Sequence, residues 1–284
     1  RLLKIKKTDF VSFRINPGIG KGGHEAVVTG GTDAKFGIPY EKAYEAYKAA
    51  KDAGVTRFGL HMMTGSNNLE PYFFREAVEK LMEIGGDIFN RLDIIPEYVD
   101  IGGGFGIPYS DQDVSLDVEL TGKLICEKFS QKLKEYNLGN PQLLIEPGRF
   151  LVGNAGTLLT TVTGVKESYR TFIGVDAGMN TLARPALYQA IHRVSAPFNS
   201  GTTRKINLCG QVCENADIFV KNISLPKSIK EDDLVLLHDV GAYGFCMSSV
   251  YNGRPRPAEV LVNGNNSTEI RRRETIEDLF QFYN

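Results

Sequence analysis

The sequence predicts an α/β fold followed by an all-β fold, and three observations support that prediction. In the first half, short apolar runs alternate with helical stretches, which is typical of parallel βα units. From Thr157 onward, short β-rich runs separated by Gly, Pro, Asn and Asp clusters indicate an antiparallel sandwich or barrel. Polar residues and glycines follow several first-half strands, and a βα barrel assembles its active site at those strand ends.

The periodicity of the first half places four strands and three helices. The expected helices are 40–53, which Gly54 closes, 70–90, with an apolar stripe that includes Phe74 and Leu81, and 116–136. The expected strands are 10–15, 55–60, 99–101 and 143–145. Four βα units make half of an eight-stranded barrel, which needs about 250 residues. We therefore expect the sequence to begin inside the barrel.

The second half has no helical period of comparable length. Its expected strands are 157–165, 170–175, 205–208, 218–223, 234–237 and 259–262. The expected domains are 1–150, the later part of a (β/α)8 TIM-type barrel, and 151–284, the β domain.

The composition excludes several classes of function. The chain has 284 residues, 42% of them hydrophobic, and a formal net charge of -1, so it offers no field for nucleic acid or an anionic membrane. Its four cysteines lack paired C-x-x-C spacing, which argues against a metal site or a disulfide framework. We expect a cytoplasmic protein, with an organelle such as a plastid left open, that acts on a small molecule.

The residues at the first-half strand ends suggest the chemistry of a site. These residues are Arg14 with Asn16, His61, the run Gly102–Gly104, and Glu146 with Arg149. Successive glycine N–H groups after a strand can bind an anion such as phosphate, although the same run also serves as a plain tight turn. Since the carboxyl ends of parallel strands meet at one edge, we expect these residues to share a site.

Ordered motifs along the whole chain resemble one enzyme family. They are Phe13-Arg-Ile-Asn-Pro-Gly18, Lys35-Phe-Gly37, Gly59-Leu-His61 with Gly65-Ser66, Asp100-Ile-Gly-Gly-Gly104, Glu146-Pro-Gly-Arg149, Arg184-Pro-Ala-Leu-Tyr188, Cys213-Glu214, Gly241-Ala-Tyr243 with Ser248–Asn252, and Ile270–Thr275. In this order they resemble the pyridoxal-phosphate-dependent decarboxylases of the alanine-racemase-like fold, and the diaminopimelate decarboxylases most closely.

The resemblance implies pyridoxal 5'-phosphate as cofactor. Its phosphate is expected on Gly102, Gly103 and Gly104 and on the backbone of Gly148 and Arg149, with Ser66 and Tyr243 contributing. Glu146 is expected to pair with the pyridine nitrogen and keep the ring protonated, although a glutamate before a proline turn can also be a plain surface residue. Met63 takes the position that stacks on the ring.

The resemblance also assigns substrate-binding and catalytic residues. Arg149, Arg184 and Tyr188 are expected around a distal carboxylate, since guanidinium groups bind carboxylates bidentately, and Glu214 around a distal ammonium. Tyr243 is also expected to bind the substrate. Cys213 is expected to act from the neighbouring subunit of a homodimer, in a catalytic set that includes Glu146 and His61. An inter-domain salt-bridge set and a buried hydrophobic cysteine are the alternatives. Cys126, Cys209 and Cys246 are expected in the core.

Two departures from the family pattern bear on the substrate and on the chain. The family usually has a second histidine two residues after His61, where this sequence has Met63. The lysine that binds the cofactor as a Schiff base lies in a Tyr-Ala-x-Lys-Ala-Asn-like strand upstream of all these motifs. No lysine here has that context, and Lys4, Lys6 and Lys7 lack the signature, so we expect the sequence to be part of a longer protein.

Three functions remain open at this stage. The first is decarboxylation of meso-2,6-diaminopimelate to L-lysine and CO2. The second is decarboxylation of another diamino acid, such as ornithine or lysine in the L or D form. Met63, in place of the family histidine, is the residue that would indicate this second function. The third is a non-catalytic homologue that survives as a binding protein.

Overall fold

The computed structural model describes residues 8–283, which separate into two compact units. One unit holds the chain up to Pro108 and Asp113–Leu151, and the other holds Tyr109–Gln112 and the chain from Val152 on. Lys4, Lys6 and Lys7 lie outside the described residues. Among the described residues, no helix combines the length and the apolar character needed to cross a bilayer.

The first unit is built on a parallel sheet of five strands in the order β2-β1-β3-β4-β5. Apart from β2, each strand lies beside the next one along the chain, as right-handed βα units require. The strands are β1 (Phe10–Asn16), β2 (Ile38–Pro39), β3 (Arg57–Met62), β4 (Tyr98–Asp100) and β5 (Gln142–Leu144). The helices are η1 (Glu25–Val27), α2 (Tyr40–Asp52), α3 (Pro71–Leu92), α4 (Val118–Tyr136) and α5 (Gly148–Val152).

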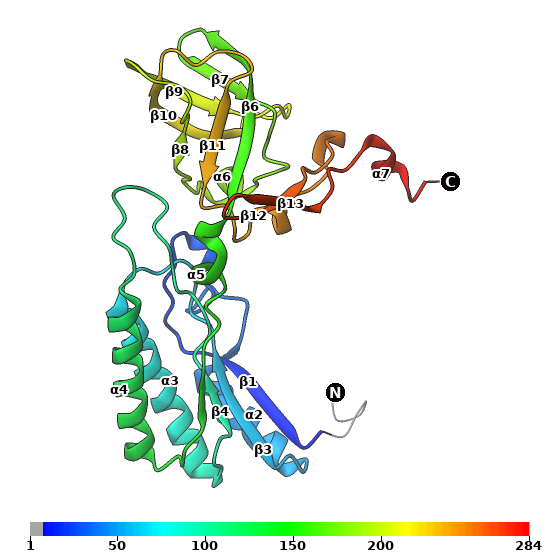
Figure 1. Cartoon of the computed structure of the whole chain (residues 1–284). Coiled ribbons are helices and arrows are strands. Elements are labelled where there is room, and N and C mark those ends of the chain that lie inside the picture. The colour runs from blue at the N-terminus through cyan, green and yellow to red at the C-terminus, as the bar shows by residue number, and fades with distance from the viewer. Residues whose placement is uncertain (1–7, 284) are drawn as a thin grey trace. The chain divides into compact units, whose positions relative to one another are not determined.

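Helices α3 and α4 lie side by side along the sheet (Figure 1). Helix α3 begins with Pro71 in its first turn and ends at Asp93, which adopts the left-handed conformation with φ 49°. Its apolar stripe, including Phe74 and Leu81, is buried in the core of the unit. Helix α4 begins at Asp117, whose side chain accepts a hydrogen bond from the N–H of Leu120.

Two lysines of α4 are buried at the contact with α3, which an amphipathic pattern does not predict. Lys128 Nζ lies 2.9 Å from Glu79 Oε1, and Lys132 Nζ lies 3.0 Å from Glu83 Oε1. Burial lowers the pKa of Lys132, but hydrogen bonds to Glu83 and Glu135 outweigh that effect and raise it. Lys132 is therefore charged at neutral pH, and the ion pairs of both lysines join the two helices.

The second unit contains a sheet of six strands in the order β10-β9-β7-β6-β11-β8 and a separate hairpin, β12–β13. Its strands are β6 (Thr157–Glu167), β7 (Thr171–Val175), β8 (Val194–Ser195), β9 (Thr203–Cys209), β10 (Ile218–Pro226), β11 (Leu234–His238), β12 (Glu259–Asn263) and β13 (Asn266–Arg271). Its helices are η2 (Gly153–Ala155), α6 (Arg184–Tyr188), η3 (Phe245–Met247), η4 (Tyr251–Gly253) and α7 (Ile276–Phe280).

Two expectations are wrong, one about the sheet of this unit and one about the three cysteines expected in the core. The sheet is not wholly antiparallel, because β7 and β9 pair in parallel; the chain between them runs through α6 and β8, which returns it in the same direction. The cysteines expected in the core are not all buried, since Cys126 and Cys246 are exposed and Cys209 is half-buried. A single small residue such as cysteine forms no periodic pattern by itself, so the sequence does not reveal whether its side chain faces the core or the solvent.

Candidate active site

The register of the parallel sheet brings three polar side chains of the first unit into one row. Arg14 of β1 pairs with His61 of β3, and His61 pairs with Asp100 of β4. Asp100 pairs in turn with Leu144, so Glu146 follows the end of β5 by two residues. Because residues in register point to the same face of a pleated sheet, the side chains of the row gather at the carboxyl ends of their strands. Glu146 joins them from the segment after β5.

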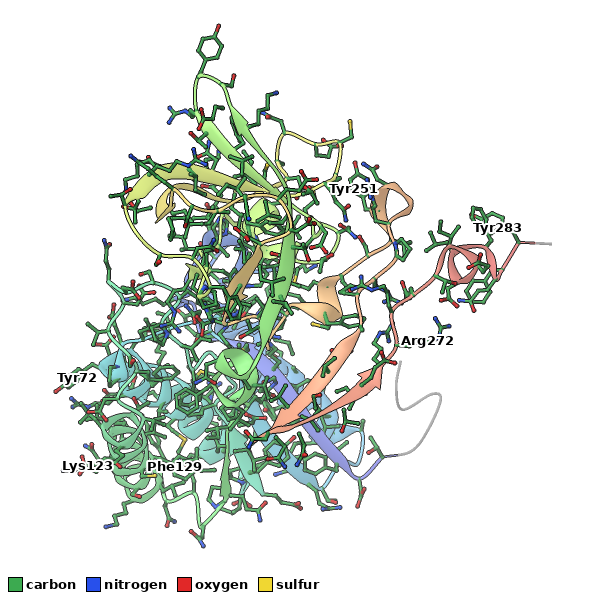
Figure 2. All side chains as sticks on the ribbon, turned by 45° about the horizontal axis from the view of Figure 1, so that its top comes forward. Tyr72, Lys123, Phe129, Tyr251, Arg272 and Tyr283 are labelled. Carbon is green, nitrogen blue, oxygen red and sulfur yellow. The ribbon has the colours of Figure 1, made fainter. Side chains whose placement is uncertain are left out.

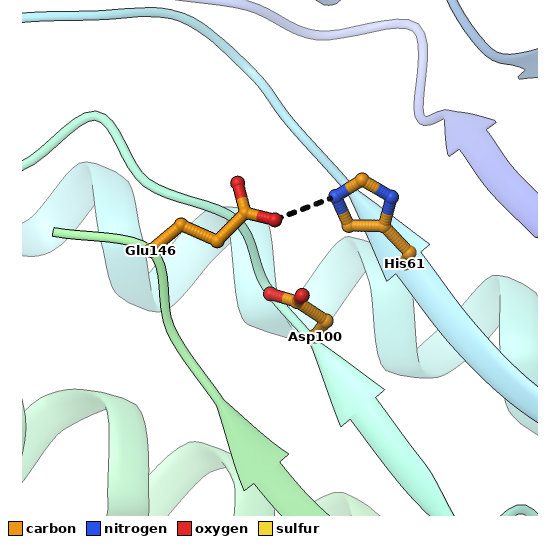
Figure 3. Close-up of side chains that lie close together, drawn as sticks. All are labelled: His61, Asp100 and Glu146. Carbon is orange, nitrogen blue, oxygen red and sulfur yellow. Dashed lines mark ion pairs between the residues drawn. The ribbon is translucent and has the colours of Figure 1, made fainter. Parts of the chain in front are cut away.

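His61, Asp100 and Glu146 form a tight group (Figure 3). One nitrogen or oxygen atom from each lies within 4.8 Å of the others. His61 Nε2 is 3.5 Å from Glu146 Oε1, which is too long for a good hydrogen bond. The Glu146 carboxylate is half exposed and is therefore accessible to a ligand.

The electrostatics of this group favour a cation at its centre. Burial raises the pKa of Glu146, and Asp100 raises it further, while Arg14 lowers it. Burial lowers the pKa of His61, and Arg14 adds to that effect while Asp100 opposes it. His61 is therefore neutral at neutral pH, and its approach to Glu146 is not an ion pair there. A protonated ring nitrogen placed between the two carboxylates would relieve their repulsion.

The glycine run after β4 is a tight turn in which two of the three glycine N–H groups already have hydrogen-bond partners. Gly102 and Gly104 have φ angles of 75° and 96°, which glycine adopts without strain. The N–H of Gly102 donates to Asp100 Oδ1 at 2.9 Å, and the N–H of Gly103 donates to Met63 Sδ at 3.1 Å. Met63 therefore contacts the turn directly, in addition to occupying the position where the family has a histidine.

The segment after β5 closes against the same turn. The N–H of Glu146 donates to Gly102 O at 2.9 Å, and a Cβ on Gly103 would collide with Glu146 O. The N–H of Gly148 donates to Glu146 O at 2.8 Å, while a Cβ on Gly148 would meet nothing within 4 Å. Arg149 is buried and donates from Nη2 to Ser66 Oγ at 3.1 Å. The space beside Gly148 is thus open to a ligand that the surrounding polar groups could hold.

In the second unit, Arg184 is buried and forms part of a network of aromatic and polar contacts. It is 6% exposed, and its Nη1 donates to His192 Nε2 at 2.8 Å. Nδ1 of His192 lies 2.9 Å from His238 O. Because Nε2 accepts from Arg184, the proton of neutral His192 belongs on Nδ1, which donates to that carbonyl. The guanidinium carbon of Arg184 also lies 4.4 Å from the centre of the Tyr109 ring.

Three of the other predicted residues of this unit lie on turns, and Tyr188 lies at the end of a helix. Cys213 and Glu214 are exposed on the turn between β9 and β10. The hydroxyl of Tyr251, labelled in Figure 2, donates to Glu214 Oε1 at 2.6 Å. Tyr243 adopts the left-handed conformation with φ 57° and is exposed. Tyr188 is half-buried at the last position of α6, four residues after Arg184.

The structure therefore brings together the predicted residues of the first unit through direct contacts. Those residues are His61, Met63, Ser66, Gly102, Gly103, Gly104, Glu146, Gly148 and Arg149. Sequence reasoning did not assign Asp100 or His192 to a site. Asp100 stood in the glycine motif at a strand end, which was a usable signal, whereas nothing in the sequence pairs His192 with Arg184.

Comparisons with known proteins all find similarity to members of one family. The family described as "Pyridoxal-dependent decarboxylase, C-terminal sheet domain" matches residues 40–241. Diaminopimelate decarboxylase of Methanothermobacter thermautotrophicus is 44% identical over 277 residues, which are 96% of this chain and 64% of that protein.

Two solved structures of diaminopimelate decarboxylases are also similar, both in complex with L-lysine. The enzyme from M. jannaschii has a TM-score of 0.87 and 34% identity, with 98% of this chain and 64% of that chain covered. The enzyme from Helicobacter pylori has a TM-score of 0.85 and 32% identity, with 95% and 66% covered. The chain thus spans just under two thirds of the length of these relatives.

Proposed function

The chain belongs to the pyridoxal-dependent decarboxylase family, and from this premise we propose that the protein decarboxylates meso-2,6-diaminopimelate to L-lysine and CO2. The observation that carries the proposal is the group of His61, Asp100 and Glu146 beside the Gly102–Gly104 turn. A pair of carboxylates next to an anion-binding turn suits a ligand with a cationic ring and a phosphate. The relatives named above are diaminopimelate decarboxylases, and two of them bind L-lysine.

The residues of the first unit fit pyridoxal phosphate. Bound there, this cofactor supplies an electron sink for the electron pair that remains when the Cα–carboxylate bond breaks. Glu146 would accept a hydrogen bond from the protonated ring nitrogen, and that cation would offset the repulsion from Asp100. The N–H of Gly104 and the hydroxyl of Ser66, which Arg149 holds in place, would bind the phosphate, and the absence of a Cβ at Gly148 would leave space for it.

Met63 holds the glycine turn and would support one face of the cofactor. Its sulfur accepts the Gly103 N–H, so this amide has a partner within the turn. A thioether packs against an aromatic ring but carries no charge, so the contact with the ring face is apolar. The replacement of the family histidine therefore changes the electrostatics of this face without removing a packing partner.

Residues of the second unit bind the substrate. Arg184 and Tyr188, on successive turns of α6, bind the carboxylate at the far end of the substrate. Tyr243 also contributes to substrate binding. Glu214 binds the distal ammonium group. Cys213 returns a proton to Cα from the neighbouring subunit of a homodimer, and its exposure leaves it accessible for that role.

The first unit forms part of a (β/α)8 barrel, and the second is the β domain of the same enzyme. Support for the barrel comes from the parallel strands, of which β1, β3, β4 and β5 follow one another in chain order, and from the TM-scores of 0.85 and 0.87 with longer family members.

A panel of substrates tests the activity. The full-length protein with added pyridoxal phosphate is incubated with meso-diaminopimelate, ornithine and lysine, each in separate reactions, and the products are identified by mass spectrometry. L-Lysine from diaminopimelate is the expected product. Faster turnover of ornithine or lysine, in the L or the D form, would contradict the substrate assignment, and no turnover of any amino acid by the cofactor-loaded protein would contradict the activity.

A further inference from the structure

We propose that Asp217 is a positioning residue that places the turn bearing Cys213 and Glu214 and ties it to the segment that leads to Arg184. The proposal rests on the function given above for Cys213 and Glu214, and it adds a residue that the family motifs did not single out. Asp217 touches neither substrate nor cofactor in this account, because its side chain is directed into the protein.

The carboxylate of Asp217 is a buried acceptor for two backbone amides. The residue is 3% exposed. Its Oδ1 accepts the N–H of Met179 and its Oδ2 accepts the N–H of Val212, each at 2.7 Å. Burial raises the pKa of this carboxyl group, although both hydrogen bonds lower it. Desolvation thus disfavours a carboxylate here, and the two amides compensate for that cost in part.

The backbone of Asp217 closes the turn between β9 and β10. Its N–H donates to Glu214 O at 3.0 Å, and its carbonyl accepts the N–H of Gly210 at 3.0 Å. Together with the Val212 bond, these contacts fix the residues on both sides of Cys213. Cys213 and Glu214 stand exposed on a turn that Asp217 bonds at Gly210, Val212 and Glu214.

The same carboxylate also reaches a second segment of the unit. Met179 belongs to the turn after β7, in which the N–H groups of Thr181 and Leu182 donate to Gly178 O at 2.8 and 3.1 Å. Helix α6, with Arg184 at its first position, begins two residues after Leu182. Asp217 therefore connects the Cys213–Glu214 turn to the turn that leads into α6.

Glycines at two positions make room for this carboxylate. A Cβ on Gly210 would collide with both oxygens of Asp217, and a Cβ on Gly178 would lie 3.0 Å from Oδ2 and 2.8 Å from Val212 Cγ2. The fit of side chain to turn is therefore tight. An asparagine would fit by size, but it offers one acceptor oxygen for two N–H donors.

The first test compares Asp217→Asn with Asp233→Asn in the full-length protein. Asp233 is a matched control, because its carboxylate also accepts a backbone N–H, from Lys230 at 2.8 Å, in a loop of the same unit. Alkylation of Cys213 by iodoacetamide is followed by peptide mass spectrometry, with exposed Cys126 of the first unit as the reference in the same molecule.

We expect Asp217→Asn to raise the alkylation rate of Cys213 by about threefold or more as the turn loosens, with Cys126 unchanged. The KM for meso-diaminopimelate rises by about tenfold, because Glu214 no longer holds its place, with a smaller effect on kcat. Asp233→Asn leaves both quantities at the wild-type value. Equal effects of the two substitutions, or no effect of Asp217→Asn, would overturn the proposal.

A second test keeps the proposal decidable if Asp217→Asn does not fold. In the wild-type protein, hydrogen exchange at the Met179 and Val212 amides is expected to be slow, and fast exchange at either would overturn the proposal. The substitution Gly210→Ala, which displaces the carboxylate, is expected to raise Cys213 alkylation as Asp217→Asn does. Its matched control is Gly164→Ala, since a Cβ on Gly164 meets nothing within 4 Å.

The two tests separate this proposal from the proposed function. If the wild-type protein turns over no diamino acid, the function fails, while alkylation and amide exchange still decide whether Asp217 holds the turn. If the wild-type protein is active and Asp217→Asn changes neither alkylation nor KM, the function stands and the role of Asp217 is wrong.

Discussion

The two units place their polar residues by different physical means. In the first, the register of a parallel sheet aligns Arg14, His61 and Asp100 at neighbouring strand ends. In the second, single buried side chains hold irregular segments, as His192 holds Arg184 and Asp217 holds the Cys213–Glu214 turn. The comparison teaches that a site built on strand ends depends on repeated backbone geometry, whereas a site built on turns depends on a few individual hydrogen bonds.

The largest effect is expected at Glu146. If this carboxylate accepts the ring nitrogen of the cofactor, Glu146→Gln reduces kcat/KM for diaminopimelate by about a hundred- to a thousandfold, as removal of one preorganised electrostatic group does elsewhere. Steady-state kinetics measure the loss. Glu127→Gln is the control, because Glu127 is an exposed residue of α4 that lies 4.0 Å from Lys123. A decrease of less than about threefold at Glu146 would contradict its role.

His192→Phe tests whether a single buried hydrogen bond stabilises the second unit. Phenylalanine keeps a ring beside Tyr109 but removes the acceptor of the buried Arg184 Nη1. We expect the free energy of unfolding to fall by about 1–3 kcal/mol, the cost of leaving a buried donor without this partner. Denaturant unfolding measures the loss.

The control for that substitution is Glu167→Gln. Glu167 is exposed and pairs with Arg204 at the surface, where an ion pair contributes about 0–1 kcal/mol. If the two substitutions lower the free energy of unfolding equally, the hydrogen bond between Arg184 and His192 stabilises the second unit no more than a surface ion pair does.

Gly103→Ala tests whether the glycine turn depends on its close approach to Glu146. A Cβ would collide with the Glu146 carbonyl oxygen, so we expect a loss of about 1–3 kcal/mol in stability, with weaker binding of pyridoxal phosphate in an absorbance titration. Gly122→Ala in α4, where a Cβ meets nothing within 4 Å, is expected instead to stabilise the protein by about 0.5–1 kcal/mol. Loss of stability in both variants would show that the close approach is not the cause.

The smallest expected effect is a change in the pH dependence of stability when Glu274 is replaced. Hydrogen bonds from Arg256 lower the pKa of this carboxyl group, and Arg271 lowers it further. A depressed pKa stabilises the folded state above the unfolded value, and that stabilisation is lost as the pH falls through the lower, folded value. We therefore expect Glu274→Gln to lower Tm by about 2 °C or less at pH 7, with the difference vanishing in acid. A difference that grows as the pH falls would contradict this sign.

The sequence predicted the first unit better than the second, for reasons that follow from the same comparison. Strands and long helices have periods that a sequence displays, so the sheet, α3 and the strand-end location of Glu146 were predictable, with boundaries off by one or two residues. Helix α6 and the strand pair β7–β9 were not, because five residues show no period and strand direction depends on the path of the chain between strands.

Buried polar contacts were the second limit of prediction. Lys128 and Lys132 are charged residues in a helix with an otherwise amphipathic pattern, and only their partners on α3 explain why they are buried. The same holds for Asp217 and His192, which belong to hydrogen-bonded groups that no spacing in the sequence reveals. The resemblance to a known family supplied the names of Arg184, Cys213 and Glu214, but not the residues that hold them.

A crystal structure of the full-length protein with pyridoxal phosphate tests the central claim most directly. The account predicts the ring at the carboxyl ends of β1, β3, β4 and β5, with the Glu146 carboxylate within hydrogen-bonding distance of the pyridine nitrogen and the phosphate at the Gly102–Gly104 turn. A ring bound elsewhere, or Glu146 directed away from its nitrogen, would contradict it.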